Sequence, residues 1–156
     1  MKKEMNQQDW TMVAEIELSY KTKIKPSSRP KVTCASDCYK AFLQSWDPNK
    51  IEFVEQFKVM LLNRNARVLG IYELSTGTVA LCPIDPKQIF CAAIKANASS
   101  IVLCHNHPSG SIEPSRADKM VTEKLSAAGK IMELPILEHI IISSEGFYSF
   151  AENGLL

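Results

Sequence analysis

Short apolar runs alternate with amphipathic segments through most of this chain, and this alternation restricts its fold more than any other feature. The run SSIVLC at 99–104 carries no charge, which is typical of a strand in the centre of a sheet. Two further runs, at 57–63 and 66–74, flank polar residues and predict a hairpin. Strands are also predicted at 77–82, 136–143 and 146–154.

Three segments between these runs have apolar residues at helical spacing and residues that begin or end helices. Because strands and helices alternate, we predict an α/β fold with helices on both faces of the sheet. The helices are predicted at 36–46 with Ser36 or Asp37 as the cap, at 85–98 with Asp85 as the cap, and at 115–129 with Gly129 at the end.

Residues 1–31 differ from the rest because they are polar and mildly basic. We interpret them as an N-terminal arm joined through the linker-like KPSSRP at 25–30. One alternating run at 13–21 predicts an edge strand. The first residues have no apolar core and do not resemble a secretory signal, and no stretch approaches the roughly 18 apolar residues of a membrane helix.

The length, net charge and cysteine count of the chain favour a single domain in a reducing compartment. The chain has 156 residues and a net charge of +1, which is not the basic footprint of a nucleic-acid-binding domain. It has five cysteines, an odd number, several within apolar runs, so we predict reduced thiols and a cytoplasmic protein. Cys34 and Cys38 leave a metal or disulfide role open, although no second pair completes a structural zinc site.

The loop HNHPSG begins directly after the predicted central strand. If that strand continues, His105 and His107 lie on one face, because side chains alternate with a period of two, and Asn106 points the other way. Ser115 then opens a helix, and Asp118 lies one turn into it, near the same edge. Three protein ligands and a water are the usual ligands of a catalytic zinc. The spacing therefore predicts a metal site.

The same residues also permit simpler interpretations. Ser115 and Asp118 fit a helix start in which a serine caps and an acid complements the dipole. The histidines would then be exposed loop residues. Ligands of this kind also suit divalent ions other than zinc.

The segment HNHPSGSIEPSRAD resembles the motif of the JAB/MPN metalloproteases, which is His-x-His-Pro, six residues, then Ser-x-x-Asp. The asparagine between the histidines and the Pro-Ser-Gly are similar to the RadC-like branch. VEQFKVMLLN, PKQIFCAAIKANASSIVLC and SFAENGLL are also similar to RadC-like segments, so the resemblance covers 32–156. It implies a three-layer α/β/α sandwich with a central mixed sheet, the cytidine-deaminase-like fold of JAB/MPN domains.

The resemblance also implies a chemistry. One Zn²⁺ ion would be held by His105, His107 and Asp118, and the enzyme would cleave a peptide or isopeptide bond of a protein substrate. Ser115 would donate a hydrogen bond to the oxyanion. The general base would be Glu55, in FVEQFKVML, with Glu73 in IYELSTGT as the rival.

Some features depart from the family or leave other functions open. His139 lies where the family has a histidine, and we predict a hydrogen-bonded core residue rather than a fourth ligand. Lys87 and Gln88 stand where the family often has Arg-Glu, and nothing in residues 1–31 resembles the helix-hairpin-helix of longer relatives. The alternatives are an interaction protein in DNA repair, a zinc deaminase, and a metal-dependent nuclease or phosphohydrolase. Contact with nucleic acid and the oligomeric state stay open.

Overall fold

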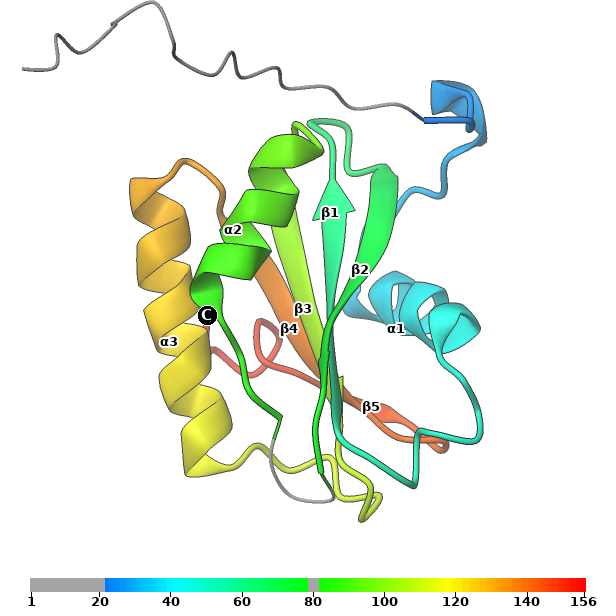
Figure 1. Cartoon of the computed structure of the whole chain (residues 1–156), viewed down its shortest axis with the longest axis vertical. Coiled ribbons are helices and arrows are strands. Elements are labelled where there is room, and N and C mark those ends of the chain that lie inside the picture. Colours follow the sequence, from blue (N-terminus) through cyan, green and yellow to red (C-terminus); the bar gives the residue numbers. More distant parts are fainter. Residues whose placement is uncertain (1–21, 79–81) are drawn as a thin grey trace, which may run out of the picture.

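A computed structural model describes residues 22–78 and 82–156, and its elements follow the predicted order of strands and helices (Figure 1). The run predicted as an edge strand at 13–21 lies outside the described residues. KPSSRP contains a short 3-10 helix, η1, at Pro26–Ser28. The helices are α1 (Ala35–Ser45), α2 (Pro86–Lys95) and α3 (Arg116–Ile131), and the strands are β1 (Gln56–Leu62), β2 (Val68–Thr76), β3 (Ser100–Asn106), β4 (Ile136–Ile142) and β5 (Phe147–Ser149).

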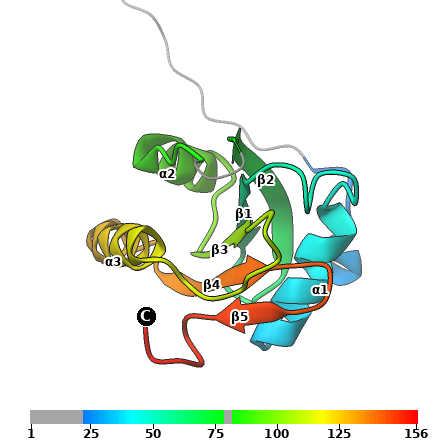
Figure 2. The same cartoon turned by 90° about the horizontal axis from the view of Figure 1, so that it is seen from below.

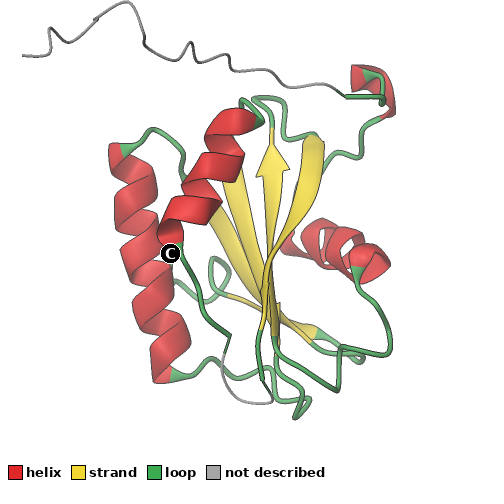
Figure 3. Ribbon diagram, in the orientation of Figure 1, coloured by secondary structure: helices red, strands yellow, loops and turns green. Residues whose placement is uncertain are grey.

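The five strands form one sheet in the order β2-β1-β3-β4-β5. β3 pairs parallel with β4, whereas the β1–β2, β1–β3 and β4–β5 pairs are antiparallel, so the sheet is mixed as predicted. Every residue of β1 and β3 is buried, as expected for strands in the interior of the sheet. The carboxyl end of β3 lies at the lower edge of the sheet, where several loops gather (Figure 3).

Helices cover the sheet on both faces, which confirms the predicted three-layer α/β/α sandwich (Figure 2). α2 and α3 lie on one face, where Ile89, Phe90 and Leu125 pack against strand residues such as Phe57 and Leu103. α1 lies on the other face, where its buried side chains pack against the alternate residues of the same strands. No helix in the described residues is long and apolar enough to cross a membrane.

The structure corrects several predicted boundaries. α2 begins as predicted, with the Asp85 side chain accepting a hydrogen bond from the Lys87 backbone. α1 does not have Ser36 or Asp37 as its cap: Cys34 is the N-cap, and Asp37 instead accepts from the backbone and hydroxyl of Thr33. In 77–82, the three described residues are not in a strand, and 79–81 lie outside the described residues. The last predicted strand shrinks to the three residues of β5 because turns follow it.

Gly129 does not end α3, contrary to the prediction, because the helix continues to Ile131. A glycine is found at this position because another segment of the backbone passes close to it, and not because the helix ends there. A Cβ atom built at this glycine would lie 2.6 Å from the backbone oxygen of Leu134, on the segment that leads into β4. The glycine therefore lets the chain turn back tightly against α3.

Gly129→Ala is expected to lower the free energy of unfolding by about 1–3 kcal/mol, because the backbone must move to relieve the contact. Ordinary helix propensity predicts the opposite sign, since alanine normally stabilises a helix by about 1 kcal/mol relative to glycine. Urea unfolding measures the change. Ala127→Gly, at an exposed position of the same helix, calibrates propensity alone. A Gly129→Ala variant as stable as the native protein would contradict the close approach.

Candidate metal centre

Three side chains from two elements converge at the carboxyl end of β3. His105 lies on β3, His107 follows it directly, and Asp118 lies in the first turn of α3. Their ligand atoms all lie within 4.8 Å of one another, and they are the one such group of three or more in the described part of the chain. His105 Nε2 is 3.1 Å from His107 Nε2 and 3.2 Å from Asp118 Oδ1, and His107 Nε2 is 3.4 Å from Asp118 Oδ2.

The strand and the helix start explain why these atoms meet. His105 pairs with Phe57 of β1 and stacks against its ring, so its side chain lies on the face that α2 and α3 cover. Ser115 is the N-cap of α3 and forms a capping box with Asp118. The Ser115 backbone and hydroxyl donate to Asp118 Oδ2 at 2.7 and 2.6 Å. The helix start therefore holds the carboxylate in place at the edge of the sheet.

The hydrogen bond of His107 fixes the hydrogen on its ring. His107 Nδ1 lies 2.9 Å from the carbonyl oxygen of Ser111. Because a carbonyl oxygen only accepts, Nδ1 carries the hydrogen, and in the neutral ring Nε2 has the lone pair. This lone pair points toward His105 and Asp118. Metal-binding histidines are commonly held in this way, through the nitrogen that does not bind the metal.

The carboxylate of Asp118 and the histidine rings of the cluster shift one another's pKa. Burial alone would raise the pKa of Asp118, but hydrogen bonds from His105 and His107 outweigh it and hold that pKa well below its ordinary value. The hydrogen bond to Asp118 in turn raises the pKa of His107. When no metal ion is bound, the short contacts between the histidine Nε2 atoms and the Asp118 carboxylate require a proton between a histidine ring and the carboxylate. A bound metal ion would take the place of that proton. Two imidazole nitrogens and a carboxylate oxygen are a donor set that fits Zn²⁺.

Two of the three side chains, His107 and Asp118, line a cavity of about 620 Å³. Ser115 lines it too, and Pro83 and Val121 contribute apolar surface. A cavity of this size is in the range of small-ligand sites. A metal held by three side chains here would keep one side open to the cavity, which is the arrangement of catalytic rather than structural zinc sites.

Glu55 lines the same cavity. It lies directly before β1, and its backbone exchanges hydrogen bonds with Gly77 and Thr78. Burial raises the pKa of Glu55, while the nearby His105 and His107 oppose the rise. The helix before it ends at Ser45, so Glu55 follows a turn segment rather than the helix itself. A half-buried carboxyl group beside the cluster suits proton transfer.

Glu73, the rival candidate, is not brought to the cavity. It pairs in register with Lys58, whose side chain lies on the α1 face of the sheet, opposite to Phe57 and His105. Its carboxylate accepts hydrogen bonds from Gln56 and Thr76 and lies 3.5 Å from Lys58 Nζ. Glu73 is thus tied into the other face of the sheet.

Ser115, the predicted oxyanion donor, lines the cavity, but its hydroxyl donates to Asp118 Oδ2. Its oxygen also accepts from the Asp118 backbone at 3.1 Å. In this conformation its hydrogen serves the carboxylate. A role at the oxyanion requires the hydroxyl to turn toward the cavity, and that role stays a prediction.

Asn106 has a structural role that the sequence interpretation missed. It is fully buried and points away from the histidines, as predicted. Its Oδ1 accepts from the Gln56 backbone at 2.7 Å, and its Nδ2 donates to the carbonyl oxygens of Ile51 and Val54 at 2.7 and 2.9 Å. These bonds fasten the segment that carries Glu55 to the strand that carries His105. Only an amide side chain both donates and accepts in this way.

Asn106→Asp is expected to destabilise the fold by about 3–5 kcal/mol at pH 7, because a buried carboxylate would face two carbonyl oxygens. Burial would raise the pKa of the new carboxyl group. The loss should therefore be largest at a pH above the raised pKa of the folded state, and it should shrink as the pH falls through that pKa and the group is protonated. Urea unfolding at pH 7 and pH 5 measures both effects. Asn65→Asp, in the exposed β1–β2 turn, is the control, and an equal change in both variants would contradict this role.

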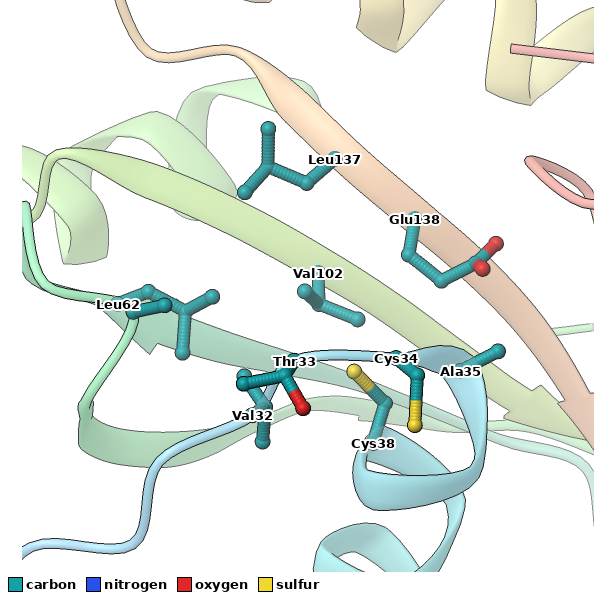
Figure 4. A pocket seen from close by; sticks show the side chains of 10 residues that line it. Val32, Thr33, Cys34, Ala35, Cys38, Leu62, Val102, Leu137 and Glu138 are labelled. Carbon is teal, nitrogen blue, oxygen red and sulfur yellow. The ribbon is translucent and has the colours of Figure 1, made fainter.

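The two cysteines left open by the sequence lie away from the cluster. Cys34 and Cys38 line a small apolar hollow of about 160 Å³ on the α1 face, beside Val102 and Leu137 (Figure 4). Both are free thiols, and burial raises the pKa of Cys38 to about 12. No metal group in the described residues includes them. Cys38 is therefore a protonated core residue.

A sequence model of the RadC-like JAB domain matches residues 32–155 of this chain. The chain belongs to the RadC-like JAB domain family. Its sheet and helices agree with the α/β fold that the resemblance implied. The match begins one residue after Lys31, which forms an isolated antiparallel bridge with Arg67 just before β2.

Similar proteins come from diverse bacteria. The UPF0758 protein of Pasteurella multocida is 41% identical over 121 residues, which are 78% of this chain and 53% of that protein. The UPF0758 protein of Chlorobium phaeovibrioides is 36% identical over 145 residues, 93% of this chain and 64% of that protein. This RadC-like chain thus spans roughly half to two thirds of these relatives' length. Their names state no activity, so they support the family and not a reaction.

Proposed function

We propose that this RadC-like domain is a zinc-dependent hydrolase that cleaves peptide or isopeptide bonds. The observation that carries the proposal is the meeting of His105, His107 and Asp118 beside a cavity that His107, Asp118 and Glu55 line. A structural cluster would need neither the cavity nor a carboxyl group with a raised pKa beside it. Three ligands, an open side and a neighbouring base are the parts of a metallohydrolase site.

His105, His107 and Asp118 would hold the ion. Bound there, zinc would lower the pKa of a water and polarise the carbonyl group of the substrate. Glu55 accepts a proton from the attacking water at its carboxylate and passes it to the leaving amine. Burial raises the pKa of Glu55, and a general base is most effective when its pKa lies nearer the pH at which the enzyme works. Ser115 keeps Asp118 oriented and, once turned, donates to the oxyanion.

Hydrolysis of a library of peptides and isopeptide-linked peptides tests the proposal directly. The zinc-loaded protein should cleave members of the library, a chelator should stop the cleavage, and added zinc should restore it. Retained zinc with no cleavage of any library member would contradict protease activity. That outcome would favour an interaction protein that uses the same fold.

A further inference from the structure

A chain of hydrogen bonds runs from the metal cluster into the core behind it. His105 Nδ1 lies 2.8 Å from His139 Nε2, and His139 Nδ1 lies 2.6 Å from the hydroxyl oxygen of Thr122. That hydroxyl is also 2.6 Å from the backbone oxygen of Asp118 and donates to it. His139 and Thr122 are fully buried, and neither belongs to the proposed ligand set.

We call the hydrogen-bonded residues His105, His139 and Thr122 the relay. Packing holds its middle ring, that of His139, in place. His139 lies on β4, paired in register with Leu103. Its ring stacks on Phe150 with centroids 4.6 Å apart, and Phe57 contacts it from another side. The His139 ring therefore has little room to turn, and its two nitrogens keep their partners in His105 and Thr122.

Counting hydrogens leaves two arrangements of the relay when both rings are neutral. In the first, the Thr122 hydroxyl donates to the Asp118 carbonyl, His139 donates from Nδ1 to Thr122, and His105 donates from Nδ1 to His139. His105 Nε2 is then a free lone pair that faces Asp118 Oδ1. In the second, the Thr122 hydroxyl donates to His139 Nδ1 instead of the Asp118 carbonyl, His139 donates from Nε2 to His105 Nδ1, and His105 Nε2 carries a hydrogen toward Asp118. Reversal moves hydrogens within neutral groups and changes no net charge.

Only the first arrangement lets His105 bind a metal ion through Nε2. We propose that Thr122 and His139 are positioning residues that set the tautomer of His105 and thereby tune the affinity of the site for zinc. The inference rests on the proposed zinc site. The Asp118 carbonyl favours the first arrangement because it can only accept, so it draws the Thr122 hydrogen away from His139. The same turn of α3 thus supplies a ligand and, through its backbone, orients a second ligand.

Thr122→Val tests the relay because valine has nearly the same shape but cannot accept the His139 hydrogen. A zinc-bound protein would then bury an unpaired N–H group, whereas the zinc-free protein could reverse the remaining bonds and avoid it. Competition with a chromophoric chelator should show zinc binding about 10- to 100-fold weaker than in the native protein. Thr122→Ser keeps the hydroxyl and should bind zinc with nearly native affinity.

Nitrogen NMR of the histidine rings in the native, zinc-loaded protein tests the same inference without a variant. The chain has three histidines, two in the metal cluster and one, His139, directly behind it, so the spectrum is simple. His105 and His139 should both carry their hydrogen at Nδ1. A zinc-loaded protein with the hydrogen of His139 at Nε2 would overturn the relay, whether or not the valine variant folds.

The outcomes separate the relay from the zinc site itself. Native protein that binds zinc tightly, with Thr122→Val folded and of equal affinity, would overturn the relay and leave the proposed function standing. Native protein that fails to bind zinc would overturn both. Weak binding by Thr122→Val, restored by Thr122→Ser, supports the relay.

Discussion

Glu55→Gln is expected to lower the rate of hydrolysis by at least about 100-fold, because an amide cannot accept the proton of the attacking water. Zinc content and thermal stability should stay close to native. Glutamine keeps the shape of the side chain, and Glu55 contributes no atom to the group of three ligands. Turnover of a cleavable peptide, measured beside elemental analysis of the same sample, gives both quantities.

Glu73→Gln is the matched control, since it makes the same change on the opposite face of the sheet. It should leave turnover within about twofold of native and instead weaken the partly exposed ion pair with Lys58. If Glu73→Gln stops hydrolysis and Glu55→Gln does not, the assignment of the base is wrong. If neither variant affects hydrolysis, a carboxylate base from this sheet edge is excluded.

Zinc is expected to stabilise the native protein against unfolding, and Asp118→Asn is expected to remove most of this effect. Free zinc at about 1,000 times its dissociation constant should add about 4 kcal/mol to the free energy of unfolding. The asparagine keeps a capping side chain on α3 but lacks the charge that binds the ion. Thermal unfolding with zinc and with a chelator measures both shifts.

Glu113→Gln removes one negative charge from an exposed position in the loop before α3, so it controls for a general change in charge. It should respond to zinc as the native protein does. An unfolding temperature of the native protein that is the same with zinc and with chelator would contradict a specific site. Equal responses of Asp118→Asn and the native protein would remove Asp118 from the ligands.

Much of the fold was predictable because local patterns and tertiary packing agree. β3 is buried on both faces, so the middle of its sequence, 101–104, is a continuous apolar run, and Pro86 after Asp85 defines the start of α2. The positions of His105 and His107 followed from the same strand, because alternation alone puts both side chains on one face. Sequence patterns within a single strand or helix were enough where that element alone decides where a side chain lies.

Features that depend on contacts between distant segments were not predictable in the same way. The choice between Glu55 and Glu73 depends on the register of β1 against β2 and β3, which decides the face that each carboxylate occupies. Gly129 looked like a helix end because its contact with the oxygen of Leu134 leaves no mark in the sequence. Nothing in the sequence around Asn106 indicates that its side chain forms hydrogen bonds with a segment some fifty residues away, with Gln56 among its partners.

The central claim is that His105, His107 and Asp118 bind a metal ion. Elemental analysis of protein purified under metal-replete conditions tests it most directly, with the native protein beside His107→Ala. We predict about one zinc ion per chain in the native protein and little or none in the variant, since a site with two remaining ligands binds weakly. Native protein without bound metal, or equal metal in both proteins, would contradict the claim.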